Sequence, residues 1–238
     1  MNFNITEFNF PIYGLFILLS LIIAAIFVYI NLSKKEVPKR IILLSLFMNM
    51  YFSILGGKLF TVLTSANEDL DFLNAGLSSY GGAIGLIIAT IIFNQIYTEK
   101  KDIILSTYVM TLPLIYSISK LGCFFAGCCN GVTYEGIFHI NYDNSFIIQK
   151  VFPVQLLETI VFMVIFFVCN KYYEKDNRYI KELVLIMCGL FKFILDFLRE
   201  SHIGILLSIN QIVSMIFIVI GLVSIFYKTK FKIEYNSK

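Results

Sequence analysis

The sequence predicts an all-α protein built as a polytopic bundle of seven transmembrane helices. The mean hydropathy is +0.80. Hydrophobic residues make up 58% of the chain and charged residues only 15%, whereas charged residues are about a quarter of an ordinary soluble domain. Apolar runs recur at about 20 residues, the length that a helix needs to cross roughly 30 Å of hydrocarbon. The composition therefore excludes an ordinary soluble domain.

Seven apolar runs define the predicted spans in chain order. They lie at about 10–31, 40–64, 77–97, 103–127, 153–172, 181–199 and 204–227. The first run is long enough to span and lacks the basic start and small-residue cleavage site of a signal peptide, so we expect the N-terminal segment to be retained. No linker, charge block or internal repeat divides the sequence. Residues 1–238 are therefore expected to form a single integral membrane domain.

Basic residues in the short loops predict the orientation. They gather in the first, third and fifth loops and in the tail, namely Lys34, Lys35, Lys39, Arg40, Lys100, Lys101, Lys171, Lys175, Arg178, Lys181, Lys228, Lys230, Lys232 and Lys238. The N-terminal segment and the loop with Glu68, Asp69 and Asp71 carry no Lys or Arg, and the loop 128–152 carries only Lys150. The prediction is an N-out, C-in topology, with 128–152 forming a small extracytoplasmic hairpin or arm.

Charged residues inside or at the edge of the spans are the first candidates for a functional site. They are Lys58, Lys120, Glu158, Lys192, Asp196 and Arg199. An ionisable group at membrane depth costs about 2.5–3.5 kcal/mol on insertion scales, so it usually marks a site. Lys192, Asp196 and Arg199 follow at i, i+4 and i+7, which predicts one face of the sixth span. The alternative is a structural ion-pair network with snorkelling ends.

Cations outnumber carboxylates in this set, and the surplus indicates an anion site. Four cationic groups stand against two carboxylates. Lysine and arginine both bind phosphate, so a positive cavity within the bilayer would suit an anionic lipid headgroup.

Two further segments, at the starts of the third and fifth spans, are candidates for the same anion site. Gly81, Gly82 and Gly85 begin the third span, where exposed amides favour anions and glycines let a ligand come close. The alternative there is a small-xxx-small helix contact. Gln155 and Glu158 lie three residues apart at the start of the fifth span and can share a partner. Alternatively, Glu158 simply neutralises one lysine.

The five cysteines do not predict a disulfide scaffold in a chain of this size. Cys169 and Cys188 lie inside apolar runs and are expected to be small buried hydrophobes. Cys123, Cys128 and Cys129 follow Lys120 near the predicted outer end of the fourth span. Any disulfide among them would join Cys123 to one of the other two.

Taken in order, these segments resemble the prolipoprotein diacylglyceryl transferase family along nearly the whole chain. Tyr-Gly-Leu at 13–15, Leu-Gly-Gly-Lys at 55–58 and Tyr-Gly-Gly-Ala-Ile-Gly at 80–85 resemble the family's Tyr-Gly, Leu-Gly-Gly-Arg and His-Gly-Gly-x-x-Gly elements. Lys-Leu-Gly-Cys-Phe at 120–124 falls where the family has its signature Arg-x-Gly-Asn-Phe.

The second half of the chain continues the resemblance. The segments 153–158, 189–199 and 210–214 are similar to Pro-Ser-Gln-Leu-Tyr-Glu, to Gly-x-x-Arg through Glu-Phe-x-Arg, and to Gly-Gln-x-x-Ser. The sequence departs from the family mainly at polar positions. Tyr80 replaces histidine, Lys58, Lys120 and Lys192 replace arginine, Cys123 replaces asparagine, and Cys128 and Asp196 replace glutamate.

The resemblance implies transfer of the diacylglyceryl group of phosphatidylglycerol to a cysteine thiol of a lipoprotein precursor, at the outer face of the bacterial cytoplasmic membrane. It implies catalytic roles for Lys120, Lys192 and Arg199 in holding phosphate, for Asp196 in orienting a cation and for Tyr80 in proton transfer. Substrate contacts are expected from Lys58, Gly81, Gly82, Gly85, Cys123, Cys128, Gln155 and Glu158. The expected partners are phosphatidylglycerol or another anionic phospholipid, the precursor peptide and membrane lipids, with no nucleic acid, metal or organic cofactor.

Three other functions stay open at this point. The first is a related transferase that uses another lipid or acceptor. The second is a membrane thiol oxidoreductase that uses Cys123, Cys128 and Cys129. The third is a noncatalytic lipid-binding bundle. Release of glycerol phosphate from phosphatidylglycerol would separate a transferase from a binder.

Overall fold

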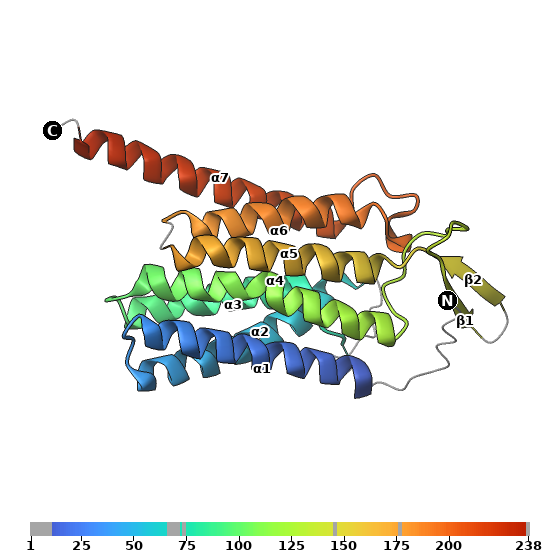
Figure 1. Cartoon of the computed structure of the whole chain (residues 1–238), viewed down its shortest axis with the longest axis horizontal. Coiled ribbons are helices and arrows are strands. Elements are labelled where there is room, and N and C mark those ends of the chain that lie inside the picture. The colour runs from blue at the N-terminus through green and yellow to red at the C-terminus, as the bar shows by residue number, and fades with distance from the viewer. Residues whose placement is uncertain (1–10, 66–71, 73–74, 145–146, 176–177, 237–238) are drawn as a thin grey trace. The chain divides into compact units, whose positions relative to one another are not determined.

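The protein is helical, with one small β-hairpin (Figure 1). The computed structural model describes residues 11–65, 72, 75–144, 147–175 and 178–236. In these residues the helices are α1 (Pro11–Lys34), α2 (Lys39–Thr64), α3 (Ser79–Ile96), α4 (Lys101–Phe125), α5 (Val154–Glu174), α6 (Ile180–Asp196) and α7 (Ile209–Asn236). The predicted all-α fold class is confirmed.

Seven helices in the described ranges follow the seven predicted spans in order, and six of them are long and apolar enough to cross a membrane. The exception is α6, which has 17 residues. The orientation and the exact number of crossings stay predictions. The predicted outward positions of residues 1–10 and of Glu68, Asp69 and Asp71 lie outside the described residues.

The prediction that the sixth helix reaches residue 199 is wrong, because α6 ends at Asp196. The amides of Phe197 and Leu198 still bond to carbonyls three residues back, which closes the helix. Beyond them, Leu198 O accepts from Val132 N at 3.0 Å and Glu200 N donates to Asn130 O at 3.1 Å. These bonds pull the chain away from the helix axis, so Arg199 is not on the face of α6 that carries Lys192 and Asp196.

Two other boundaries differ from the prediction for local reasons. α4 ends at Phe125, short of residue 127, because Gly127 has φ 69° and turns the chain out of the helix. α7 begins at Ile209, later than residue 204, because Gly204 has φ 78° and a hydrogen-bonded turn precedes the helix. Both differences lengthen the connections that surround the charged residues.

The described residues divide into two compact units, one from 11–20 and 113–236 and the other from 21–112. In the second unit α2 packs closely on α3. A Cβ added at Gly81 would collide with the carbonyl of Gly56, and one added at Gly85 with the carbonyl of Phe52. Gly81 and Gly85 therefore form the small-residue helix contact that the sequence left open as an alternative.

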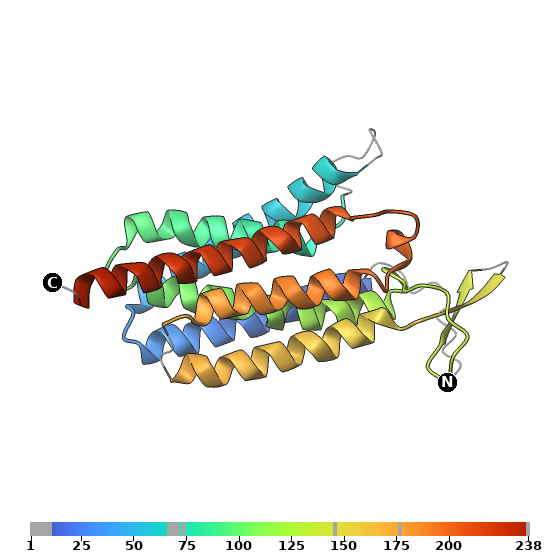
Figure 2. The same ribbon diagram turned by 90° about the horizontal axis from the view of Figure 1, so that it is seen from above.

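In the first unit α6 packs along α7 (Figure 2). A buried carboxylate near the start of α6 joins the two helices: Glu182 Oε1 lies 2.6 Å from Lys228 Nζ and accepts from Ser224 Oγ at 2.8 Å. Glu182 is 1% exposed. Its loss of hydration is thus offset by an ion pair and a hydrogen bond across the helix interface.

A β-hairpin lies beyond the start of α5 (Figures 1 and 2). β1 (Ile140–Asn144) pairs antiparallel with β2 (Ile147–Val151), with Ile140 opposite Val151. Phe124 packs with these two residues in a small apolar cluster, which fixes the base of the hairpin to the end of α4. A hairpin, one of the two forms expected for the segment 128–152, is thus present with its strands at Ile140–Asn144 and Ile147–Val151, and its side of the membrane stays a prediction.

Candidate functional site: a buried ion cluster

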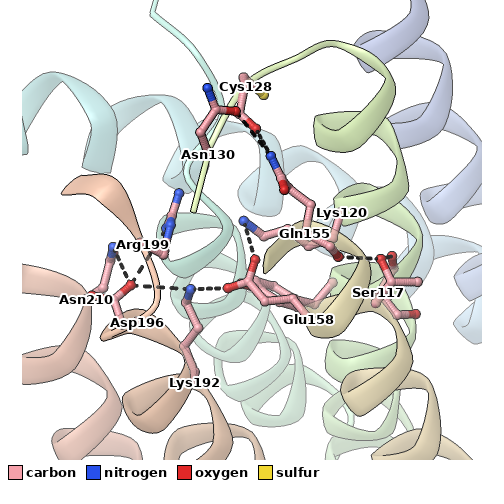
Figure 3. Close-up of polar contacts among 12 residues, drawn as sticks. Ser117, Lys120, Cys128, Asn130, Gln155, Glu158, Lys192, Asp196, Arg199 and Asn210 are labelled. Atoms are coloured by element: carbon pink, nitrogen blue, oxygen red, sulfur yellow. Dashed lines mark hydrogen bonds and ion pairs between the residues drawn. The ribbon is translucent and has the colours of Figure 1, made fainter. Parts of the chain in front are cut away.

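Glu158, on the second turn of α5, is the centre of a buried ion cluster (Figure 3). Its Oε1 accepts from Lys192 Nζ at 2.5 Å and from the Tyr116 hydroxyl at 2.7 Å. Its Oε2 lies 3.0 Å from Lys120 Nζ. Glu158 therefore neutralises two lysines from two different helices, whereas the alternative drawn from the sequence was that it neutralises one.

The Tyr116 ring supports the same two lysines from one side. Lys120 Nζ lies 5.2 Å from the ring centroid and Lys192 Nζ lies 5.5 Å from it. These are cation–π distances, and the contact gains strength away from water. Tyr116 thus touches all three charges through its ring and its hydroxyl.

Asp196, the last residue of α6, extends the cluster toward α7. Its Oδ1 lies 3.4 Å from Lys192 Nζ and accepts from Asn210 Nδ2 at 3.5 Å. Its Oδ2 accepts from the Ser208 hydroxyl. Lys192 and Asp196 thus lie on one face of α6, as their i and i+4 spacing predicted, and form an ion pair there.

Ser208 also caps α7. Its hydroxyl accepts from Gln211 N at 3.1 Å, and Gln211 Oε1 accepts from Ser208 N at 3.0 Å. This reciprocal pair is a capping box, which satisfies two amides at the helix start. The first turn of α7 and the end of α6 are therefore joined through one hydroxyl.

Arg199 is the least neutralised cation of the cluster. Its Nη1 lies 3.7 Å from Asp196 Oδ1, which is too long for a hydrogen bond. Within the described part of the chain, Arg199 Nε is buried and has no hydrogen-bond partner. With Lys120 and Lys192 there are three cations for the two carboxylates Glu158 and Asp196. This cluster therefore has a positive surplus and donor groups that an anion can use, whereas the surplus predicted from the sequence counted Lys58 as well.

Gln155 holds the loop that follows α4 against the start of α5. Its Nε2 donates to Cys128 O at 2.8 Å and to Asn130 Oδ1 at 3.3 Å (Figure 3). Gln155 is fully buried and lies one helical turn before Glu158. Through these two bonds Gln155 positions the loop.

Three cysteine thiols lie together beside this loop. The sulfur atoms of Cys123, Cys128 and Cys129 all lie within 4.8 Å of one another, and all five cysteines are free. The pKa of the Cys129 thiol is lowered, because Cys123 and Cys128 form hydrogen bonds with its sulfur. Positive charge on Lys120 and Arg199 acts in the same direction. One thiol of the three is thus prepared to ionise.

The remaining predicted site residues lie in the other compact unit. Tyr80 is buried in the first turn of α3, and Gly82 lies two residues after it. Lys58, on α2, donates to Phe72 O at 3.2 Å and lies 5.6 Å from the Phe72 ring centroid. The structure brings Lys120, Gln155, Glu158, Lys192, Asp196 and Arg199 together. For Tyr80, Lys58, Gly81, Gly82 and Gly85, in the other unit, a place in the same site stays a prediction.

Sequence reasoning missed Tyr116 and Ser208. Tyr116 precedes Lys120 by four residues, so helical periodicity would have placed both on one face of α4. Ser208 and Gln211 have the spacing of a capping box, which was available as a signal. The contact of Ser208 with Asp196 spans a turn of irregular structure and has no sequence signal.

Comparisons with known proteins identify the family of this chain. A family model described as prolipoprotein diacylglyceryl transferase matches residues 1–227. A phosphatidylglycerol–prolipoprotein diacylglyceryl transferase from Clostridium tetani is 28% identical over 235 residues, which is 90% of this chain and 92% of the relative.

Two relatives with the same name match a shorter region. The protein from Campylobacter hominis is 27% identical over 62% of this chain and 54% of its own length, and that from Helicobacter acinonychis is 28% identical over 65% and 58%. The chain thus covers little more than half of these two relatives. The family model nevertheless covers nearly all of the sequence, and this chain belongs to the prolipoprotein diacylglyceryl transferase family.

Proposed function

We propose that this protein transfers the diacylglyceryl group of phosphatidylglycerol to the cysteine thiol of a lipoprotein precursor, as a multi-pass protein of the bacterial cytoplasmic membrane. The observation that carries the proposal is the buried ion cluster with its positive surplus at Arg199. Family membership supplies the reaction class.

The reaction needs a thiolate nucleophile and a site for the phosphate that leaves. The acceptor sulfur attacks the glyceryl carbon that carries the phosphate ester, a C–S bond forms, and the C–O bond to phosphate breaks. The electron pair of that bond leaves on glycerol phosphate, and the thiol proton goes to a base. Negative charge builds up on the phosphate oxygen, so fixed cations beside it stabilise the transition state.

Arg199 and Lys120 are the groups we assign to the phosphate. Arg199 has a buried Nε available for an anion, and its planar guanidinium can hold two phosphate oxygens at once. Lys120 contributes a point charge while Glu158 holds its ammonium group in place. Lys192 is shared by Glu158 and Asp196, so it chiefly keeps the carboxylates charged and oriented.

We also propose that Tyr80 moves a proton in the reaction, as the family's histidine position implies. Replacement of Tyr80 by phenylalanine removes the hydroxyl and keeps the ring. The product release rate should fall by roughly 10²-fold or more if the hydroxyl transfers a proton. Tyr51→Phe, an exposed position on α2, is the matched control. Equal rates for both variants would remove Tyr80 from the mechanism.

The decisive experiment measures release of glycerol phosphate from phosphatidylglycerol by the purified full chain in lipid nanodiscs, with a cysteine acceptor peptide and with its serine analogue. We expect release only with the cysteine peptide, together with a peptide mass increased by diacylglyceryl. If neither peptide leads to release of glycerol phosphate, the protein is a noncatalytic lipid-binding bundle. Release with both would indicate another acceptor. Phosphatidylethanolamine in place of phosphatidylglycerol tests the headgroup.

The thiol cluster favours one second candidate, a membrane thiol oxidoreductase. Three sulfur atoms within 4.8 Å could exchange a disulfide with a partner dithiol. Trapping of cysteines in cells with an alkylating reagent would reveal an oxidised fraction for an oxidoreductase. We expect the three thiols to stay reduced.

A further inference from the structure

The three thiols gather because the chain turns sharply after α4. Cys128 N donates to Cys123 O at 3.1 Å and Gly127 N donates to Phe124 O at 3.3 Å. Gly127 and Cys129 both have positive φ, at 69° and 61°. Cys123 comes from the last turn of the helix and the other two from the turn itself. Backbone geometry, more than apolar packing, thus directs the three sulfur atoms to one point.

Cys129 adopts its backbone conformation at a cost. A left-handed conformation is disfavoured by about 1–2 kcal/mol for an L-residue with a side chain. Glycine, which avoids this cost, is used two residues earlier at Gly127. Strain that is kept at a residue with a reactive side chain is a recurrent feature of functional sites.

The turn is held from outside as well. Cys128 O accepts from Gln155 Nε2 at 2.8 Å, and Gln155 is buried at the start of α5. The turn after Cys129 continues into the backbone bonds between residues 130–132 and 198–200. The three thiols are therefore positioned before any ligand arrives, which lowers the free-energy cost of binding one.

The charges around the cluster fit three thiolates. Lys120 lies three residues before Cys123 in α4 and interacts electrostatically with Cys123 and Cys129. Arg199 interacts electrostatically with Cys129. A three-thiolate site for a divalent ion has a net charge of −1, which the nearby positive charges of Lys120 and Arg199 stabilise.

The distances fit a thiolate-bound metal. Zinc–sulfur bonds are about 2.3 Å long and tetrahedral, which requires sulfur–sulfur separations of roughly 3.8 Å. The three sulfur atoms lie within 4.8 Å of one another, so small side-chain rotations close the difference. Three protein ligands leave the fourth position of the metal open, as in catalytic rather than structural zinc sites. Cys128 is exposed, which makes the cluster accessible.

From this geometry we infer that Cys123, Cys128 and Cys129 form a three-thiolate zinc site whose open position takes the acceptor thiol. The acceptor part of this inference rests on the proposed diacylglyceryl transfer. A thiol that coordinates zinc is deprotonated, so the acceptor sulfur is held as the thiolate that the attack requires. The proton passes to solvent when the thiol binds. After attack on the glyceryl carbon the product is a thioether, a neutral ligand that leaves the metal, and glycerol phosphate carries the electron pair of the broken C–O bond.

The metal site is tested on the full-length protein in detergent under reducing conditions. The protein is stripped with a chelator, loaded with Zn²⁺ for metal analysis, and loaded with Co²⁺ for absorption spectra. We expect one equivalent of Zn²⁺ and the near-ultraviolet thiolate-to-cobalt band. Cys128→Ser changes an exposed position, so we expect the variant to fold. It should weaken Zn²⁺ binding by more than the roughly 10–100-fold that loss of a supporting contact costs.

Cys169→Ser and Cys188→Ser are the matched controls, because both are buried cysteines outside the cluster. They should bind Zn²⁺ as the unmodified chain does. Equal affinity in Cys128→Ser and in the controls would overturn the zinc site. Absence of the thiolate-to-cobalt band in reduced, folded protein would also overturn it.

The open position is tested by adding acceptor peptide to the Co²⁺-loaded protein. The cysteine peptide should increase the thiolate-to-cobalt band by about a third, because a fourth thiolate joins three. The serine peptide should leave the band unchanged. If both peptides leave it unchanged while Zn²⁺ still binds, the acceptor role is overturned and the metal site stands. If the cysteine peptide binds the metal but no diacylglyceryl transfer occurs, the failure lies with the proposed function alone.

Discussion

Lys192 Nζ lies 2.5 Å from Glu158 Oε1, and the two side chains are 5% and 0% exposed. They come from α6 and α5, so the pair joins two helices at the level of the charge cluster. A second lysine, Lys120 from α4, lies on the other carboxylate oxygen. One glutamate thus fixes the relative positions of three helices and two of the three cations.

Replacement of Glu158 by glutamine should destabilise the protein. The variant keeps the side-chain shape but removes the carboxylate charge that both buried ammonium groups contact, and Lys192 then keeps only Asp196 at 3.4 Å. Removing one partner of a buried ion pair costs about 3–5 kcal/mol. The midpoint of thermal unfolding in detergent measures it. Glu200→Gln, at an exposed position of the 3₁₀ turn, is the control and should unfold as the parent does. Parent-like stability of Glu158→Gln would show that the cluster is not tightly coupled.

Removal of the Tyr116 hydroxyl should have a smaller effect than loss of its ring. Tyr116→Phe deletes the 2.7 Å hydrogen bond to Glu158 and keeps the cation–π contacts with both lysines. A hydrogen bond to a charged group contributes about 1.5–3 kcal/mol. Tyr116→Leu removes the ring as well and should unfold at lower denaturant concentration than Tyr116→Phe. The same midpoint for both variants would exclude a role for the ring.

Arg199 should matter more for phosphate than for folding. Its ion pair with Asp196 is weak, because the atoms Nη1 and Oδ1 are 3.7 Å apart, while its buried Nε is available to an anion. Arg199→Ala should lower the rate of glycerol phosphate release by roughly 10²–10³-fold, the effect of losing one group that stabilises developing charge. Arg199→Lys keeps the charge but loses the bidentate geometry, so its release rate should lie between that of the unmodified protein and that of Arg199→Ala.

The control for Arg199 is Arg178→Ala, an exposed arginine just before α6. It should leave the release rate unchanged. Binding of phosphatidylglycerol headgroups, measured separately by calorimetry, should weaken in Arg199→Ala. A normal rate in Arg199→Ala would assign the phosphate to another cation.

Gly85 should tolerate no side chain. A Cβ there would collide with the Phe52 carbonyl on α2, which is rigid backbone. Overpacking of this kind costs about 1–3 kcal/mol, so Gly85→Ala should lower the unfolding midpoint. Gly76→Ala is the matched control in the same compact unit, because nothing lies within 4 Å of its added Cβ. Equal midpoints for the two variants would contradict the close approach of α2 and α3.

Loss of the Ser208 hydroxyl should affect the start of α7 and Asp196 together. Ser208→Ala removes the N-terminal cap, which costs about 1 kcal/mol, and a hydrogen bond to the Asp196 carboxylate. We expect lower stability and a reduced release rate in the same variant. Ser201→Ala, at an exposed position nearby, should change neither. A change in stability alone would confine Ser208 to the cap.

The fold could be predicted because a bilayer imposes a simple length rule. Apolar runs long enough to span the bilayer predicted all seven helices in order, and the polar run between the fourth and fifth helices predicted a hairpin or arm. The ends of the helices were less predictable. Residue 199 follows an apolar run and looked helical, but hydrogen bonds from residues 130–132 end α6 at Asp196. Competition from a distant strand-like segment leaves no signal in local periodicity.

By itself the sequence determined the membrane class and the charged residues that are candidates for a site, because an ionisable side chain at membrane depth has few stable alternatives. Tertiary structure alone decided which charges meet. It placed Glu158 between two lysines and brought Arg199, which follows the end of α6, close to Asp196. It also showed that Gly81 and Gly85 serve helix packing. It also brought the sulfur atoms of Cys123, at the end of α4, and of Cys128 and Cys129, in the turn after it, within 4.8 Å of one another, because Gly127 and Cys129 adopt positive φ angles.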